Sequence, residues 1–287
     1  MSRLSEKVGN VSEFIYRYKY FSDSQWLRAT ISERTIKFTN PHKFNDPFDC
    51  MPAFDVRYSR DLSRFHPGIR SMLNLDDLSG VELEEKISMC ESHMAQVIGS
   101  GDFLSGLLSG ASVLSLSKIP DSTLMWSHYA QNHSGVVLEF KIDISDEEFS
   151  FDDSYSKFIC QDVEYVEARP LMLVDGSPSN PETIIGEIFL AKSSVWSYEQ
   201  ESRVLKNTGG EGVFKYDDSL LSSVILGAKN ASENEIRELV SVAGKELGRE
   251  IPVYKTDFCK RNYRVLIPDF TFRFEEGDIQ SDYPAGR

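Results

Sequence analysis

Two glutamates and an arginine alternate near residue 200, in the segment WSYEQESR (Trp196–Arg203). On a strand, Glu199, Glu201 and Arg203 would point to one face. Two carboxylates on one face repel unless one is protonated or a cation matches them. The segment therefore has two interpretations. Either Glu201 simply pairs with Arg203, or one of the two glutamates serves a substrate hydroxyl or a developing positive charge.

The residues around this acidic pair could complete a ligand site. Trp196 and Tyr198 would supply an aromatic wall beside the glutamates. Lys192 could hold a phosphate, but a lysine near the end of an amphipathic helix is more often only solvated, and that interpretation is favoured.

A second segment, LMWSHYAQNHSG (Leu124–Gly135), brings together His, Tyr, Ser and Trp. In an unbroken helix His128 and His133 would lie about 140° apart around the axis. They would not form a metal-binding pair of the i,i+4 type, and too few ligands converge for zinc. Ser127, His128 and Tyr129 could instead face a ligand, and a structural role for His128 in the core is an equal alternative. We expect Trp126 to pack into the sheet and Gly135 to be explained by backbone geometry alone.

A third segment, FNDPFD (Phe44–Asp49), contains the strong turn signal Asn45-Asp46-Pro47. Asp46 and Asp49 could bind a metal ion or a ribose. The favoured alternative is that Asp46 accepts hydrogen bonds from nearby backbone amides, as short carboxylates commonly do.

Composition narrows the class of protein. The chain has 287 residues and a formal net charge of −14, which argues against non-specific binding to nucleic acid. Four cysteines lie far apart without a CxxC motif, so we expect free thiols in a reducing cytosol rather than a zinc site. There is no signal-peptide pattern and no apolar run near the roughly 20 residues that a membrane span needs. GxSxG, Walker, HExxH and GxGxxG motifs are all missing from the sequence.

The elements that must position these residues follow from periodicity and turn signals. Strands are predicted at Phe14–Phe21, Thr35–Thr39, Val113–Leu116, Val136–Phe140, Asp162–Glu167, Val224–Gly227, Val253–Phe258 and Tyr263–Ile267, and a hairpin at Ser202–Lys206 and Gly212–Tyr216. Helices are predicted around Trp26–Ile31, Val81–Ile98, Phe103–Leu108, Leu124–Gln131, after Pro181 and over Ser232–Leu247. Ser232 and Glu235 predict a capping box at the N-terminus of the last helix, and Gly248 is predicted to end that helix.

These elements predict an α+β fold, because strands and helices are interspersed without a regular β-α-β-α alternation. We expect one domain over residues 14–270 with a mixed or antiparallel sheet and a helical insertion near residues 60–110. Residues 1–13 are predicted to be a flexible N-terminal segment, and residues 271–287 a polar tail.

The three segments together resemble the bacterial domain-of-unknown-function 2971 family. The matching parts are YKY (Tyr18–Tyr20), FNDPFD, LMWSHYAQNHSGVVLEF (Leu124–Phe140), the run from Lys192 to Val204, and VILGAK (Val224–Lys229). The resemblance spans about residues 15–267. It implies membership but no established reaction.

The order of these motifs is also similar to that of ADP-ribosyltransferases. In those enzymes an early His or Arg holds NAD, a middle segment packs the nicotinamide and a late Glu stabilises the cationic transition state. The resemblance implies that Arg17 or Lys19 holds the pyrophosphate and that Glu199 or Glu201 is the late glutamate. This chain departs from the pattern because the usual Ser-Thr-Ser triplet is missing, and such an analogy alone does not establish activity.

Three functions follow as hypotheses, the first favoured. The first is an ADP-ribosyltransferase-like enzyme that uses NAD, with a nucleic acid or protein as acceptor. The second is a non-catalytic sensor that binds a nucleotide or another small molecule in bacterial stress or phage defence. The third is a metal-dependent phosphodiesterase using Asp46, Asp49, His128 and His133.

The favoured hypothesis assigns a site to most of these residues, with no resident metal. Its catalytic residues are Glu201, Glu199 and His128. Its NAD-binding residues are Arg17, Lys19, Tyr20, Asn45, Asp46, Trp126, Ser127, Tyr129, His133, Trp196, Tyr198 and Arg203. The sequence leaves open the acceptor and the oligomeric state, and it predicts a cytoplasmic protein without a membrane partner.

Overall fold

The computed structural model describes residues 14–55, 70–71, 74–145, 155–173, 185–206 and 209–272. The predicted flexible segment 1–13, part of the predicted insertion near residues 60–110, and all but the first two residues of the predicted tail 271–287 lie outside these residues. Contacts within the chain group into two compact units. Unit 1 comprises Met1–Ile36, Leu116–Ile159 and Phe214–Arg287, and unit 2 comprises Lys37–Ser115 and Cys160–Val213.

Unit 1 is built on a mixed sheet. Its hydrogen-bonded strands follow the order β13 (Val253–Lys255), β12 (Leu221–Leu226), β5 (Val136–Asp143) and β1 (Phe14–Phe21). β1 and β5 are antiparallel from Phe14 opposite Asp143 to Phe21 opposite Val136, whereas β12 and β13 are parallel. The alternation in FIYRYKYF therefore forms a strand with the predicted bounds, and it buries Tyr18 and Tyr20.

Helices α1 (Gln25–Ser32) and α8 (Glu233–Glu246) of unit 1 contact each other. Leu27 and Ile31 of α1 and Ile236 and Val240 of α8 are buried, as their amphipathic spacing predicts. The capping box predicted at Ser232 is absent, because this residue has φ −100° and ψ 23° and its side chain makes no cap hydrogen bond. Gly248 follows the helix with φ 65°, so the predicted exit is confirmed.

Unit 2 contains strands that pair over long sequence distances. β4 (Ser112–Ser117), β10 (Glu201–Lys206) and β6 (Cys160–Asp162) are neighbours in this order, and β10 and β6 are antiparallel. Two parallel pairs join β3 (Ala53–Asp55) to β8 (Leu171–Leu173) and β7 (Glu164–Val166) to β9 (Ala191–Ser193). The predicted hairpin is wrong, because β10 lies between β4 and β6 while β11 (Gly212–Lys215) pairs with β2 (Thr35–Phe38).

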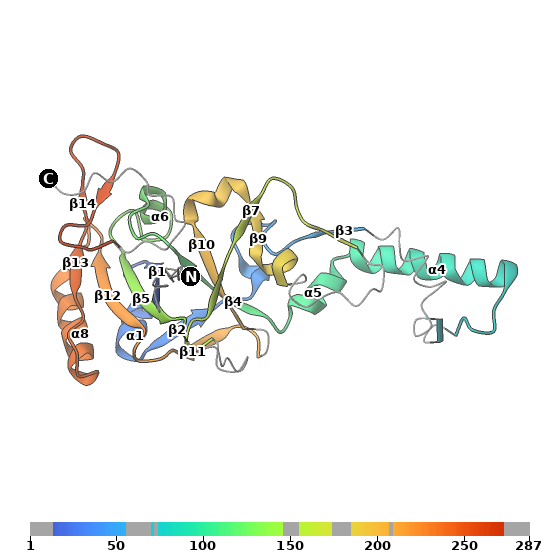
Figure 1. Ribbon diagram of the computed structural model, residues 1–287, viewed down its shortest axis with the longest axis horizontal. Helices are drawn as coiled ribbons and strands as arrows, with labels where there is room; N and C mark the ends of the chain where they lie inside the picture. The colour runs from blue at the N-terminus through green and yellow to red at the C-terminus, as the bar shows by residue number, and fades with distance from the viewer. Residues whose placement is uncertain are drawn as a thin grey trace, which may run out of the picture. The chain divides into compact units, whose positions relative to one another are not determined.

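The helical insertion predicted near residues 60–110 has a described counterpart in unit 2. Helix α4 (Gly80–Gly99) contacts α5 (Asp102–Leu108), as Figure 1 shows. Leu104 and Leu108 of α5 form a small buried cluster with Ile188. Ile188 lies in a single turn of π-helix, η2 (Gly186–Leu190), which follows the helical residue Ile185. The first turn of the helix predicted after Pro181 lies outside the described residues.

Shorter elements complete the chain: η1 (Pro41–Lys43), α6 (Thr123–His128), η3 (Ser194–Glu199), β14 (Asp257–Phe258) and β15 (Val265–Leu266). The helices and the mixed sheet confirm the predicted α+β fold class. In the part of the chain that the structure describes, no helix has the length and apolar character that crossing a bilayer requires.

Candidate functional site

The FNDPFD loop uses its two aspartates differently. The Asp46 carboxylate accepts a hydrogen bond from the Phe48 backbone N–H at 2.9 Å, so the favoured local interpretation is confirmed. Asn45 is exposed on the same loop. Asp49 is buried, and its carboxylate instead lies 2.6 Å from the Arg203 guanidinium.

The acidic segment near residue 200 is not one continuous strand. Glu199 ends the 3-10 helix η3, Gln200 adopts a left-handed conformation with φ 42°, and only Glu201 begins β10. The prediction that both glutamates point from one strand is therefore wrong. They nevertheless converge, because the turn at Gln200 folds them around one ammonium group: Lys192 Nζ lies 2.5 Å from Glu199 and 2.8 Å from Glu201.

Lys192 is itself buried on β9 and not solvated at a helix end, which corrects the favoured sequence interpretation. The reason is a cluster of opposite charges in unit 2, which we call the ion cluster: Asp49, Lys192, Glu199, Glu201 and Arg203. Its three carboxylates and two cations leave one net negative charge when all are ionised. All five residues are less than 10% exposed.

Arg203 contacts both Glu201 and Asp49 of the ion cluster. Its Nε and Nη2 atoms each lie 2.9 Å from a Glu201 oxygen, and its Nη1 donates to the Phe189 carbonyl at 2.7 Å. The predicted pairing of Glu201 with Arg203 is thus confirmed. The forked contact uses the planar donor geometry that only arginine offers.

The electrostatics keep Glu201 and Lys192 ionised. Burial alone would raise the pKa of Glu201, but Arg203 and Lys192 outweigh it and lower the pKa to about 2. Burial alone would lower the pKa of Lys192, but Glu201, Glu199 and Asp49 outweigh it and raise the pKa. A carboxylate with so low a pKa is a poor proton acceptor at neutral pH, so Glu201 acts here as a fixed negative charge.

Aromatic side chains surround the ion cluster, and the sequence predicted only Trp196 and Tyr198 among them. Lys192 Nζ lies 5.4 Å from the centre of the Trp196 ring, whose centre is 6.0 Å from that of Tyr198. The Tyr165 hydroxyl accepts a hydrogen bond from the Glu201 backbone N–H at 2.8 Å. Tyr165 lies 36 residues from Glu201, and its one sequence signal was the alternation of β7.

A cavity of about 250 Å³ lies in unit 2 beside Lys192. Its lining also includes Phe48, Arg169, Glu167 and Glu187. Phe48 is 62% exposed, which is unusual for a phenylalanine, and the Arg169 guanidinium carbon lies 5.8 Å from the centre of its ring. The cavity therefore combines an open aromatic face, two cations and two carboxylates.

The histidine segment lies in unit 1. Ser122 caps α6 by accepting a hydrogen bond from the Met125 backbone N–H. The helix ends at His128 and does not continue to Gln131, so the angle expected between the two histidines does not apply. Trp126 is fully buried, as predicted, while His128 is exposed.

Most of the other unit 1 residues that the sequence predicts for the site lie in two groups of contacting aromatic rings. The Tyr20 ring meets Trp126 edge to face at 5.6 Å, and His133 lies parallel to Trp126 with ring centres 6.4 Å apart. The Tyr129 ring contacts that of His128 at 6.3 Å. Arg17 is buried on β1, where its Nη1 donates to the Tyr16 carbonyl.

Lys19 follows Arg17 by two positions on β1, so both side chains leave the same face of the strand. Sequence reasoning missed Glu139, a buried carboxylate that accepts hydrogen bonds from Tyr18 and Ser223. The structure thus joins Glu199, Glu201 and Arg203 in unit 2, and Tyr20, Trp126, Ser127 and His133 in unit 1.

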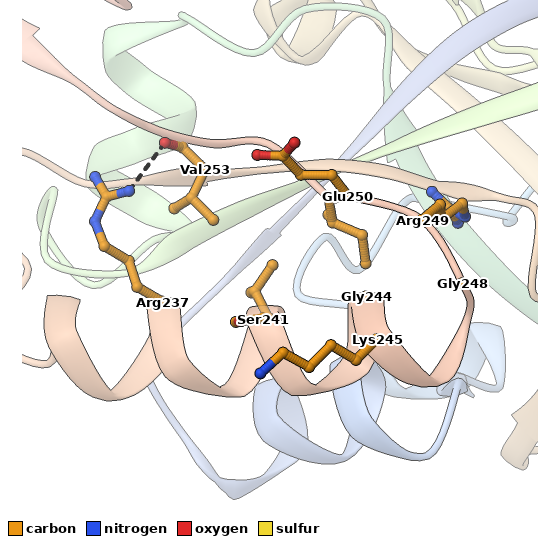
Figure 2. A pocket seen from close by; sticks show the side chains of 10 residues that line it. Arg237, Ser241, Gly244, Lys245, Gly248, Arg249, Glu250 and Val253 are labelled. Carbon is orange, nitrogen blue, oxygen red and sulfur yellow. Dashed lines mark hydrogen bonds between the residues drawn. The ribbon is translucent and has the colours of Figure 1, made fainter.

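Two further observations delimit the sites. Within the described ranges, no three His, Cys, Asp or Glu side chains are grouped so that they could hold a metal ion. A cavity of about 720 Å³ lies in unit 1 between α8 and the segment that leads into β13 (Figure 2). Arg237 crosses one end of it and donates to the Val253 carbonyl at 3.1 Å. This cavity contains none of the residues that the sequence predicts for a site.

Comparisons with known proteins bear on the same segments. Residues 125–204 match the model of a family described as "Protein of unknown function (DUF2971)". The peroxisomal Lon protease homolog 2 of Caenorhabditis elegans is 34% identical over 53 residues, and that of Caenorhabditis briggsae is 30% identical over 53 residues. Each alignment covers 18% of this chain and only 7% of the relative's length. No solved structure matches the chain.

Proposed function

From the geometry of unit 2 we propose that the chain, whose residues 125–204 match the family described as "Protein of unknown function (DUF2971)", binds a planar, anionic small molecule of mononucleotide size. The observation that carries the proposal is the cavity beside the ion cluster, with Phe48, Arg169 and Lys192 in its lining. Phe48 offers a face on which a base can stack, and the Arg169 guanidinium can bind a phosphate.

The size of the cavity supports a ligand of this class. Pockets that enclose drug-sized ligands measure about 300–1,000 Å³, and the cavity measures about 250 Å³. It suits a nucleoside or mononucleotide, or one half of a dinucleotide such as NAD. The carboxylates of Glu167 and Glu187 in the lining are suited to accept hydrogen bonds from ribose hydroxyls.

The ion cluster supports the proposal by fixing one wall of the cavity. Lys192 is held by carboxylate oxygens at 2.5, 2.8 and 3.4 Å, so its position is set before any ligand arrives. A group that is held in place loses little conformational entropy when it binds, which favours affinity.

Calorimetric titration with AMP, ADP-ribose and NAD tests the proposal. We expect AMP to bind, and Phe48→Ala to weaken binding about 5- to 150-fold, because losing base–aromatic stacking costs about 1–3 kcal/mol. Val195→Ala is the matched control, since Val195 is 71% exposed in the same unit and lies outside the cavity lining. The proposal is wrong if no nucleotide binds, or if both variants bind as the wild type does.

A second test addresses the phosphate. Arg169→Gln should weaken AMP binding more than adenosine binding, because only AMP carries the phosphate. Lys37→Gln removes an exposed cation of unit 2 that does not line the cavity, and it should change neither affinity. Equal losses for AMP and adenosine would contradict the assignment of Arg169 to the phosphate.

Glycosyl transfer from NAD is the second candidate function. The observation that favours it is that Glu199 and Glu201 both hold Lys192, which also lines the cavity, so fixed negative charge lies beside the place for a ligand. Such charge is suited to stabilise an oxocarbenium-like sugar, with a nucleic acid or protein as acceptor.

Mass spectrometry of products separates the two candidates. Transfer or cleavage predicts release of nicotinamide from NAD, which Glu199→Gln or Glu201→Gln should abolish in protein that still melts cooperatively. Nucleotide binding without nicotinamide release supports the binding module alone. The proposed setting is a reducing cytosol in bacterial stress or phage defence, and what supports the reducing compartment is that all four cysteines are free thiols.

A further inference from the structure

Ser127 and His133 of unit 1 meet in a geometry that the sequence did not predict. The Ser127 hydroxyl donates to the Thr123 carbonyl at 2.8 Å, and its Oγ lies 3.1 Å from Nε2 of His133. Ser127 is partly exposed, whereas His133 is only 8% exposed. An accessible hydroxyl in front of a buried imidazole is the arrangement of a nucleophile and its base.

A strained turn produces this contact. Gln131, Asn132 and His133 have φ angles of 49°, 53° and 71°, so three successive non-glycine residues adopt the left-handed conformation. L-residues normally enter that region singly. The His133 N–H donates to the Trp126 carbonyl at 3.1 Å, which brings the imidazole back over the end of α6. Strain of this kind collects at functional sites.

The imidazole of His133 is also incompletely satisfied. Its Nδ1 atom is buried and has no hydrogen-bond partner among the described residues. When Nε2 accepts the Ser127 proton, Nδ1 carries the ring hydrogen. Buried polar atoms without a partner are few in native structures and call for an explanation.

The surroundings keep the imidazole neutral. Its ring lies between Trp126, stacked at 6.4 Å, and Phe258, edge-on at 5.2 Å. Burial lowers the pKa of His133, and the positive charge of Lys229 lowers it further. At neutral pH the imidazole is therefore free to accept a proton. Lys229 Nζ lies 5.8 Å from the centre of the Phe258 ring, at the same small apolar surface.

We propose that Ser127 is a nucleophile and His133 its general base, in a site that takes an activated carboxylic ester. The Ser127 hydroxyl rotates from the Thr123 carbonyl toward His133, and its Oγ forms a bond to the carbonyl carbon of the ester while its proton moves to Nε2 of His133. The ester C–O bond then breaks, and the leaving alcohol takes that proton. Water, deprotonated by the same nitrogen, hydrolyses the acyl-serine and restores both residues.

Labelling with an alkyl fluorophosphonate tests this site independently of nucleotide binding in unit 2. The probe forms an Oγ–P bond, fluoride leaves and the serine proton passes to the base. We expect one adduct per chain at Ser127 by peptide mass spectrometry, and burst release of p-nitrophenolate from p-nitrophenyl acetate. His133→Gln should slow labelling about 100-fold or more. Ser134→Ala, in the same turn, should label as the wild type does.

A second measurement guards against variants that fail to fold. Ser127→Cys should react with iodoacetamide faster than Ser127→Cys combined with His133→Gln, at equal cooperativity of thermal unfolding. The labelling rate of the native protein should fall in acid as His133 is protonated. The assignment is overturned if native protein labels at Ser127 no faster than urea-unfolded protein, or if His133→Gln leaves both rates unchanged.

Discussion

Replacing Arg203 with methionine removes the guanidinium at the centre of the ion cluster while keeping an apolar chain of similar length. Arg203 is completely buried, at 0% exposure, and it holds Glu201 at 2.9 Å and Asp49 at 2.6 Å. The substitution leaves these two carboxylates with Lys192 as the remaining cation of the cluster. Removing one partner of a buried ion pair costs about 3–5 kcal/mol, since the other charge stays buried without compensation. We expect the free energy of unfolding to fall by this amount.

The pKa of Glu201 gives a second route to the same magnitude. Burial opposes the shift, but Arg203 and Lys192 lower this pKa from 4.5 to about 2. At about 1.4 kcal/mol for each unit of pKa, the difference corresponds to about 3 kcal/mol of stability. Because the folded pKa is depressed, this stability is fully present above about pH 4.5 and is lost as the pH falls toward 2.

Urea unfolding followed by circular dichroism, at pH 7 and at pH 2.5, measures the effect. We expect Arg203→Met to lose about 3–5 kcal/mol at pH 7 and distinctly less at pH 2.5, where the wild type has itself lost the contribution. Arg237→Met is the control, because Arg237 and Glu233 form an exposed i,i+4 pair at 2.9 Å. That pair should be worth less than about 0.5 kcal/mol. A loss below about 1 kcal/mol for Arg203→Met, or an equal loss at both pH values, would refute the reasoning.

Two further predictions concern the replacement of glycines by alanine and the reactivity of cysteine thiols. Gly227→Ala would place a Cβ 2.2 Å from the His133 backbone oxygen, so we expect thermal unfolding to report a loss of about 1–3 kcal/mol or more. Gly106→Ala, whose Cβ meets nothing within 4 Å in helix α5, should instead gain up to about 1 kcal/mol, and equal effects of the two changes would contradict this account. Backbone hydrogen bonds lower the pKa of Cys259, whereas burial raises that of Cys50. Alkylation of native protein at pH 7, read by mass spectrometry, should therefore modify Cys259 well before Cys50; the reverse order would be incompatible with these environments.

Much of the local structure could be predicted from the sequence. The alternation of Phe14–Phe21 predicts β1 with its observed bounds, and the spacing along Val81–Ile98 predicts α4 to within one residue at each end. Both succeed because side-chain periodicity and capping are properties of neighbouring residues. Helix α6 is an exception. It ends at His128, and residues 131–133 of the turn that follows are left-handed although none of them is a glycine, so the sequence did not predict the turn.

The candidate sites were only partly predictable. Glu199, Glu201 and Arg203 were singled out because they are close in the sequence, and the Glu201–Arg203 pair needs no distant partner. Asp49 lies 154 residues from Arg203, so nothing local indicates that the two charges meet. The contact of Ser127 with His133 was missed for a different reason: both were named, but their approach depends on the turn that follows α6.

By itself the sequence determined the α+β class and most helices and strands, because these follow from short-range patterns of apolar and capping residues. Only the tertiary structure decided which charges share a dry environment. β10 pairs with β6 and lies beside β4, and it does not pair with the next strand in the chain. On β10, Arg203 contacts Glu201 of its own strand and Asp49 of a loop that is far from it in the sequence. Buried charges interact strongly at short range whatever their separation along the chain, so the site is set by strand pairing and not by local pattern.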